Sequence, residues 1–362
     1  MYFYMPTRIY CEKNCVRNHA KELSALGNKA LIVTGKRSAK ENGSLADVQG
    51  ALTEEGIPFV LFDRIEENPS IETVMEARDF GNMSGADFVI GIGGGSPLDA
   101  AKAISLMMKH RAKTESFLYE KGSDDAYPVV SVPTTCGTGS EATPYAILTI
   151  HKKRTKSSIS HRIFPALALC DPTYLKNLPL AVLASTSIDA LGHFMESYIN
   201  NNATLYSKML CIEGMKLWAS VKDLLLGEEG SDTDYEALLN ASTLAGMAIS
   251  HTGTSLPHGL SYYPTYETGV PHGKAVGIFL PAYLNAAEND QKEILSLLNF
   301  RDTEEFASYI QQVLGTVAIS DELKRAAVEG MLSNQAKLAN CPFPVDENVM
   351  QGMFLSKCIS SE

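Results

Sequence analysis

The chain has 362 residues, which is enough for two or three domains that each bury a hydrophobic core. Hydrophobic residues make up 45% of it and charged residues 20%, as in ordinary soluble globular proteins. A net charge of −11 disfavours a nucleic acid partner, and no apolar run approaches the ~20 residues of a membrane span. The N-terminal residues do not resemble a signal peptide, and the seven cysteines are scattered, so we expect reduced thiols and a cytoplasmic protein.

Short apolar runs alternate with helical patterns in the first half of the sequence. The runs are rich in β-branched residues and are bounded by glycine, proline or aspartate, as strands are. Strand, helix and strand at this spacing favour a parallel sheet that is covered on both faces. We predict strands at 29–35, 58–63, 87–92, 127–135 and 165–172, with a helix at 71–83.

The pattern changes after about residue 178. Clusters of β-branched residues almost vanish, and apolar residues recur at intervals of three and four, which is typical of amphipathic helices. We therefore predict an α/β domain over residues 1–177 and a helical domain over residues 178–362. The predicted helices of the second domain cover 181–199, 205–225, 235–249, 274–288 and 303–314.

A glycine-rich stretch, GIGGGSPLDAAKAI at 91–104, joins the third predicted strand to a helix. Ser96 is a suitable N-cap, Pro97 suits the first helical turn, and Asp99 stands where a capping box has its acid. The glycines allow close approach of a ligand, and the free N–H groups of a helix start favour an anion. A standard dinucleotide fingerprint follows the first strand of its fold, so this loop differs from it. Alone, the stretch equally fits a capped turn that binds nothing.

Two further polar loops follow predicted strands. PTTCGTGSEATPY, at 133–145, carries hydroxyl groups at Thr134, Thr135, Thr138 and Ser140. The first predicted strand ends in TGKRS, which places two basic side chains there. Parallel α/β sheets present their ligand contacts at the carboxyl ends of strands. Each loop taken singly is an ordinary turn, but three of them at neighbouring strand ends predict a ligand site.

The stretch STSIDALGHFMESY, at 185–198, has the strongest chemical signal. Asp189 and His193 are four residues apart in a helical pattern and therefore share one face. His258 and His272 follow, 14 residues apart and separated by prolines, so they belong to separate elements. One carboxylate and three imidazoles would form a four-ligand site for a divalent metal. Each histidine taken alone is more often a surface or core residue.

Together these motifs resemble the iron-dependent (group III) alcohol dehydrogenases. The similar stretches are GGGSPLDAAK, PTTCGTGSE, the Asp–x3–His of DALGH and the histidine pair, and they occur in the family's order between PTRIY and GIFLP. The resemblance implies an α/β, Rossmann-like N-terminal domain with a parallel sheet and an all-α C-terminal metal domain, the dehydroquinate synthase-like fold. It also implies a homodimer.

The resemblance assigns roles to single residues. The implied cofactor-binding residues are Asn68 near the adenosine, Gly94, Gly95 and Ser96 at the pyrophosphate, Asp99 in the same motif, Thr134, Thr135 and Thr138 on the nicotinamide side, and Lys156. The implied metal ligands are Asp189, His193, His258 and His272, with Fe²⁺ as the metal and Zn²⁺ as a possible substitute.

One position departs from the family. Some members carry another histidine four residues after the third ligand, as part of a proton path, and here Tyr262 stands there. Tyr262, water or the cofactor ribose could each carry the proton.

The implied activity is hydride transfer between NAD(P)(H) and a small primary alcohol or diol and its aldehyde. The metal would polarise the substrate oxygen, and the cofactor would carry the hydride. A zinc-dependent polyol dehydrogenase of the glycerol type is the nearest alternative. A dehydroquinate-synthase-like lyase would need a basic pocket that we do not find near the ligands, and a catalytically dead nucleotide-binding protein would not need four retained ligands.

The loop at residues 35–38 predicts the cofactor. Family members that use NAD typically have an aspartate at the end of this strand, and its carboxylate would repel a 2′-phosphate. This chain has Gly35 there, followed by Lys36 and Ser38, which could contact the phosphate. We therefore expect NADP(H) to be favoured over NAD(H). The alternative is a plain loop with solvated cations.

Overall fold

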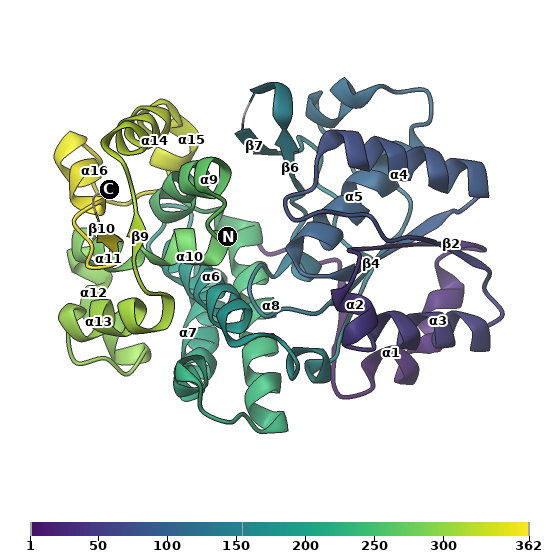
Figure 1. The fold of residues 1–362 in the computed structure, drawn as a ribbon, viewed down its shortest axis with the longest axis horizontal. Coiled ribbons are helices and arrows are strands. Elements are labelled where there is room, and N and C mark those ends of the chain that lie inside the picture. The colour runs from purple at the N-terminus through teal and green to yellow at the C-terminus, as the bar shows by residue number, and fades with distance from the viewer. Residues whose placement is uncertain (1, 154, 361–362) are drawn as a thin grey trace. The chain divides into compact units, whose positions relative to one another are not determined.

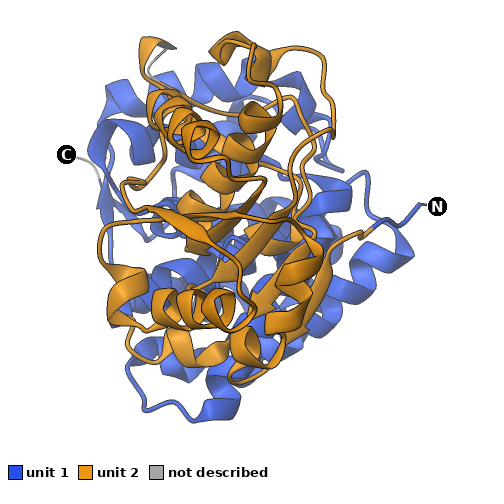
Figure 2. Ribbon diagram, turned by 90° about the vertical axis from the view of Figure 1, so that its right-hand side faces the viewer, with its two compact units in different colours: residues 1–4, 136–138, 179–362 blue, residues 5–135, 139–178 orange. Residues whose placement is uncertain are grey.

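The computed structural model describes residues 2–153 and 155–360. Two compact units are coloured separately in Figure 2. The α/β unit, in orange, consists of residues 5–135 and 139–178, and the helical unit, in blue, holds the rest of the described chain. Residues 136–138, in the middle of the hydroxyl-rich loop, therefore group with the helical unit. No helix in the described ranges combines the length and apolarity that a membrane span needs.

A six-stranded parallel sheet is the centre of the α/β unit. Its order is β1-β8-β5-β4-β2-β3. All five predicted strands are present, and a strand that we did not predict, β1, forms one edge. The strands are β1 (Arg8–Cys11), β2 (Ala30–Thr34), β3 (Phe59–Phe62), β4 (Phe88–Gly93), β5 (Val129–Pro133) and β8 (Leu167–Cys170).

Alternate side chains of the strands enter two separate hydrophobic cores. Leu31 and Val89 face the core that includes α4 (Ile71–Ser84) and α5 (Gly95–Lys109). Ile32 and Ile90 face the core that includes α1 (Cys15–Asn18) and α3 (Ser44–Glu54), on the opposite face of the sheet (Figure 1). This period of two, with both faces buried, explains the nearly continuous apolar strands of the sequence.

Shorter elements complete the α/β unit. An antiparallel hairpin of β6 and β7 follows the hydroxyl-rich loop. The bounds are α2 (Ser38–Glu41), β6 (Ile147–Ile150), β7 (Thr155–Ser158), η1 (Ala20–Ala25), η2 (Glu115–Tyr119), η3 (Ser140–Ala142), η4 (His151–Lys153) and η5 (Pro172–Leu175).

The helical unit is built around α6, which packs against α7, α8 and α10. Its elements are α6 (Leu180–Tyr198), α7 (Leu205–Ser220), η6 (Lys222–Leu226), α8 (Asp232–Thr252), α9 (Leu256–Thr268), α10 (His272–Gly277), α11 (Leu280–Ala286), α12 (Glu288–Leu297), α13 (Thr303–Leu314), α14 (Asp321–Ser333), α15 (Gln335–Leu338), α16 (Glu347–Met353) and a pair of two-residue parallel strands, β9 (Val317–Ala318) and β10 (Ile359–Ser360).

The predicted helix at 274–288 was wrong as a single element. The chain forms α10, which ends at Gly277, and then α11, which has Pro281 in its first turn. Proline has no N–H to continue a preceding helix but fits the first turn of a new one. The predicted helix at 205–225 likewise ends as α7 at Ser220, and a 3₁₀ turn follows.

The packing of α6 against α7 gives a stability test. A Cβ at Gly214 of α7 would lie 2.0 Å from Cζ of the fully buried Phe194 of α6. Gly214→Ala should therefore lower the free energy of unfolding by about 1–3 kcal/mol. Gly50, inside α3, has no neighbour within 4 Å of an added Cβ, so Gly50→Ala should raise stability by about 0.5–1 kcal/mol. Urea midpoints measure both, and an unchanged Gly214→Ala midpoint would contradict the packing.

Candidate metal and cofactor sites

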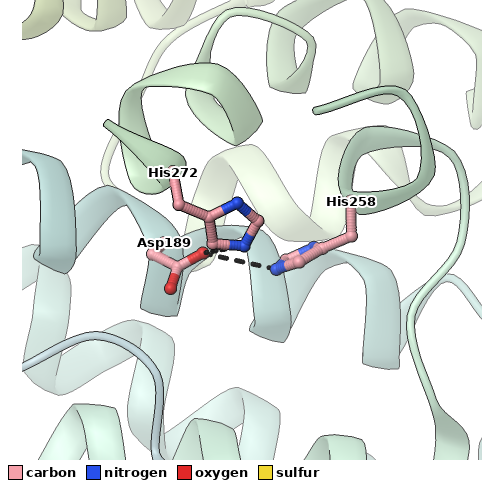
Figure 3. A group of neighbouring side chains, drawn as sticks. All are labelled: Asp189, His258 and His272. Atoms are coloured by element: carbon pink, nitrogen blue, oxygen red, sulfur yellow. Dashed lines mark ion pairs between the residues drawn. The ribbon is translucent and has the colours of Figure 1, made fainter. Parts of the chain in front are cut away.

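Three of the four predicted metal ligands meet in the helical unit. Asp189, His258 and His272 each offer one ligand atom, and these atoms all lie within 4.8 Å of one another. They come from three helices, α6, α9 and α10, and Figure 3 shows both imidazoles turned toward the carboxylate. Nε2 of His258 lies 3.3 Å, and Nε2 of His272 lies 3.8 Å, from Oδ1 of Asp189.

This group fits a divalent cation. Oδ1 of Asp189 and Nε2 of His258 are buried, and neither forms a hydrogen bond within the described part of the chain. Buried polar atoms are nearly always paired, so two bare atoms facing each other indicate a missing partner that both can bind. Carboxylate oxygen and imidazole nitrogen are ligands that Fe²⁺ and Zn²⁺ accept.

The charges of the group support each other. Burial opposes ionisation of Asp189, but the histidines around it outweigh this and hold the pKa of its carboxyl below the usual range. Burial also disfavours a charged His258, but Glu196 and Asp189 outweigh it and raise the pKa of this imidazole to about 9. Without a metal, His258 is therefore protonated between the two carboxylates, and a cation bound there would take the place of its Nε2 proton.

His193 lies beside this group but is not one of the three residues that converge. Its ring stacks on that of His258, with centroids 4.4 Å apart. Its Nδ1 is 3.2 Å from the carbonyl oxygen of Gly137, and because a carbonyl only accepts, Nδ1 carries the proton. Burial lowers the pKa of His193 to about 4, so the ring is neutral and its Nε2 has a free lone pair.

Our sequence reasoning missed Glu196. It lies on α6, three residues after His193 and seven after Asp189, and its side chain is fully buried. A carboxylate oxygen contacts Nδ1 of His258. The stretch HFMES could have revealed it, because helical spacing puts Glu196 on the same face of the helix as Asp189 and His193.

Tyr262 also lies next to the metal group. Its ring stacks on that of His272, with centroids 6.0 Å apart. Nζ of Lys337 lies 5.5 Å from the centre of the same ring and donates to Thr254 Oγ1. Burial lowers the pKa of Lys337, against the opposing effect of Glu196.

The predicted cofactor loops lie at one edge of the α/β unit's sheet. β5, β4 and β2 are neighbours, with Thr34 opposite Ile92 and Gly93 opposite Pro133. Because the strands are parallel, the residues after each of them emerge side by side. Three loops meet there, at 35–38, at 94–96 and at 134–135.

The start of α5 differs from our prediction. The helix begins at Gly95, with Gly94 as its N-cap and no side-chain cap, so Ser96 is not the N-cap and Asp99 forms no capping box. Ser96 Oγ instead accepts a hydrogen bond from Asn68 N, at 3.0 Å. The amides of the first turn are thereby left without a capping side chain, which is the arrangement that favours an anion.

Three of the residues implied for the cofactor form one cluster. Asn68 contacts Ser96 through its N–H, and its Oδ1 accepts from Nζ of Lys156, at 2.6 Å. Asn68 has a φ of 58°, in the left-handed region, which asparagine tolerates better than most residues. The hairpin that carries Lys156 is thus tied to the start of α5.

Asp99 is already engaged by the protein. Its carboxylate accepts from Ser140 Oγ and from Ile147 N, and Nζ of the buried Lys102 lies 3.4 Å away. Lys102 also donates to the carbonyl oxygen of Tyr145, at 2.7 Å. These contacts hold the segment after the hydroxyl-rich loop against α5.

The remaining predicted residues divide between the units. Thr134 is buried, and Thr135 lies close to Gly94, with its Oγ1 3.2 Å from where a Cβ of that glycine would be. Thr138 belongs to the helical unit. Gly35 follows β2 directly, and Lys36 and Ser38 after it are exposed.

Comparison with known proteins accounts for both units. The model of the iron-containing alcohol dehydrogenase family matches residues 6–172, and that of the family's C-terminal part matches residues 183–348. The chain belongs to the iron-containing alcohol dehydrogenases. The resemblance and fold class predicted from sequence are thereby confirmed.

Relatives in this family have known activities and structures. A long-chain primary alcohol dehydrogenase of Thermoanaerobacter ethanolicus is 31% identical over 74% of this chain and 68% of its own. An NADPH-dependent butanol dehydrogenase of Clostridium saccharobutylicum is 32% identical over 78% and 72%. The crystal structure of an iron-containing alcohol dehydrogenase from Thermotoga maritima is 35% identical, covers 98% of both chains and has a TM-score of 0.90.

Removing one of the three converging side chains of this iron-containing alcohol dehydrogenase tests the candidate metal site. Loss of a residue that only supports a ligand can lower metal affinity by roughly 100-fold. His272→Ala removes a side chain that would bind the metal directly, so it should lower the affinity for Zn²⁺ by more than that. His110→Ala, which removes a histidine of the α/β unit, is the control and should retain wild-type metal content. Metal analysis after dialysis tests both, and a fully loaded His272→Ala protein would remove that residue from the site.

The glycine loop can be tested separately from the metal. Gly95→Val puts a branched side chain where a pyrophosphate would approach the backbone, so the Kd for NADP(H) should rise strongly. Metal content should stay at the wild-type level, because the loop belongs to the other unit. Fluorescence titration measures cofactor binding, and unchanged binding would show that the loop is only a structural turn.

Proposed function

We propose that this chain interconverts a small primary alcohol or diol and its aldehyde by hydride transfer with NAD(P)(H). One observation carries the proposal: in a member of this family, a carboxylate and two imidazoles converge, and the buried Oδ1 of Asp189 and Nε2 of His258 form no hydrogen bond. The relatives described above are an alcohol dehydrogenase and a butanol dehydrogenase, which supports the same substrate class. The comparisons give no better support to a zinc-dependent polyol dehydrogenase.

Asp189, His258 and His272 would hold the metal, with His193 as the fourth ligand. Bound there, a divalent cation would act as a Lewis acid toward the substrate oxygen. Fe²⁺ is the metal that we infer, and Zn²⁺ competes for such ligands because it binds them more tightly.

The protein's own groups would hold the reactants and move the proton. The phenol of Tyr262 is our candidate proton carrier, because its ring stacks on the ligand His272. The cofactor itself would carry the hydride, so the protein needs no nucleophile.

The α/β domain, residues 1–177, would bind the cofactor, and residues 178–362 would bind the metal. The first-turn amides at Gly94, Gly95 and Ser96 would accept the pyrophosphate. Around them we propose Asn68 and Lys156 at the cofactor, with Asp99 in the same motif, and Thr134, Thr135 and Thr138 on the nicotinamide side.

We also infer a cytoplasmic homodimer. All seven cysteines are free thiols, which suits a reducing compartment, and the dimer rests on the family resemblance. Light scattering on the purified protein tests the oligomeric state.

The activity test is a panel of primary alcohols, diols and aldehydes, assayed anaerobically with Fe²⁺-loaded protein and with both nicotinamide cofactors. We expect turnover of at least one small substrate, and its loss on metal removal and in Asp189→Ala. Turnover that is independent of metal in the stripped protein would contradict the proposal.

The cofactor preference depends on Gly35. We expect NADP(H) to be favoured by at least about tenfold in kcat/KM, or about 1.4 kcal/mol, the scale of one charge-assisted contact. Gly35→Asp should erase or reverse the preference, because a carboxylate repels the 2′-phosphate. Its Cβ would lie 3.4 Å from the carbonyl oxygen of Ile65, so the side chain can be accommodated.

Gly35→Asn is the matched control, since it adds nearly the same bulk without the charge. It should keep most of the preference for NADP(H). Equal wild-type rates with both cofactors, or a Gly35→Asp protein that keeps its preference, would show that this loop does not read the 2′-phosphate.

A further inference from the structure

We propose that Glu196 is a positioning residue for the metal: it keeps the proton of His258 on Nδ1 and thereby leaves Nε2 to bind the cation. The inference rests on the proposed metal site and adds to it a residue outside the four ligands. It is carried by the contacts of the two carboxylate oxygens.

The first oxygen determines the tautomer of His258. Oε2 of Glu196 contacts Nδ1 of the imidazole, and both side chains are buried. An ionised carboxylate can only accept, so Nδ1 donates and carries a proton. In the neutral ring this leaves Nε2 bare, and Nε2 is the atom that faces Oδ1 of Asp189, at 3.3 Å.

The second oxygen fixes the position of the helix that carries His258. Oε1 of Glu196 accepts from Ser255 N, at 2.7 Å, and from His258 N, at 3.3 Å. These amides belong to the N-terminus of α9, where helices have unpaired N–H groups. One carboxylate of α6 therefore holds both the backbone and the ring of the same ligand.

The residue at the N-cap position of α9 does not cap the helix with its own side chain. Ser255 is the N-cap, yet its side chain forms no cap hydrogen bond. Its hydroxyl lies 2.9 Å from Tyr283 OH, which donates to the carbonyl oxygen of Ile199, and 3.4 Å from Oε1 of Glu196, to which it can donate. Because the serine side chain accepts from no backbone N–H of the helix, Glu196 supplies the acceptor for the start of α9.

An amide cannot replace this carboxylate. The side chain of Gln in Glu196→Gln has the same shape but only one acceptor oxygen, whereas both positions now face N–H donors. An amide nitrogen at the Oε2 position would force the His258 proton onto Nε2, the metal-binding atom. At the Oε1 position it would oppose two backbone N–H groups, and in either case a negative charge beside the cation is lost.

A purely structural cap would behave differently. Loss of a cap lowers the stability of the fold but does not by itself change the affinity of a ligand atom or its tautomer. Asp171→Asn supplies the matched control, because Asp171 is a buried carboxylate of the α/β unit that accepts from Cys15 N and Thr173 N. It loses the same kind of hydrogen bonds in the other unit of the chain.

The experiment compares full-length wild type, Glu196→Gln and Asp171→Asn after removal of metal. Zn²⁺ affinity is measured by competition with a chromophoric chelator, and Co²⁺ absorption reports the geometry of the ligands. We expect Glu196→Gln to bind Zn²⁺ about 10- to 100-fold more weakly and to change the Co²⁺ spectrum. Asp171→Asn should lose stability but keep wild-type affinity and spectrum.

Nitrogen-15 NMR of histidine-labelled, Zn²⁺-loaded wild type gives a second test that needs no variant and remains decisive if Glu196→Gln fails to fold. His258 should be protonated at Nδ1 and metallated at Nε2, and the opposite pattern would overturn the inference. If Glu196→Gln binds Zn²⁺ with an affinity within twofold of wild type, the positioning role of Glu196 is overturned, but the metal site is not. A wild-type protein that binds no Zn²⁺ would instead overturn the metal site itself, and the inference with it.

Discussion

The need to pair buried charge organises the helical unit. α6 buries two carboxylates, Asp189 and Glu196, and an unpaired carboxylate in such surroundings would be very costly. Glu196 is satisfied by donors from the start of α9, and Asp189 faces imidazoles from α9 and α10. The two acids therefore draw three helices together, and the candidate metal site is the place where a buried carboxylate oxygen forms no hydrogen bond. A bound cation would pair that oxygen.

In the α/β unit, the candidate ligand site is formed by backbone N–H groups rather than by charged side chains. Parallel strands that are covered on both faces end together, so β5, β4 and β2 present their following loops at one edge. The start of α5 has no side-chain cap, and its neighbours Asn68 and Lys156 are tied to the loop by hydrogen bonds. A helix start left uncapped but held in place is preorganised for an anion.

Periodic features were predictable from the sequence, and single contacts were not. The five predicted strands and helix 303–314 follow from hydrophobic spacing, which local sequence reports directly. The edge strand β1 was missed because four partly exposed residues have no such pattern. Ser96 was misjudged as the N-cap because the helix starts two residues earlier than predicted, at a glycine whose local preference is weak. Glu196 was missed because a glutamate on a helix usually faces solvent, and its partner is 62 residues away.

Carboxylates in this protein can be sorted by what already contacts them. Asp99 accepts from a hydroxyl and an amide, with a buried lysine beside it, so any effect on the cofactor acts through the segment that it holds. Glu196 accepts from backbone and imidazole N–H groups and acts through His258. Only Asp189, of these three, keeps a buried oxygen without a hydrogen bond. Sequence reasoning singled out Asp99 and Asp189 but not Glu196. The unsatisfied oxygen is what distinguishes the candidate ligand Asp189 from the other two, because a cation binds where acceptor capacity remains.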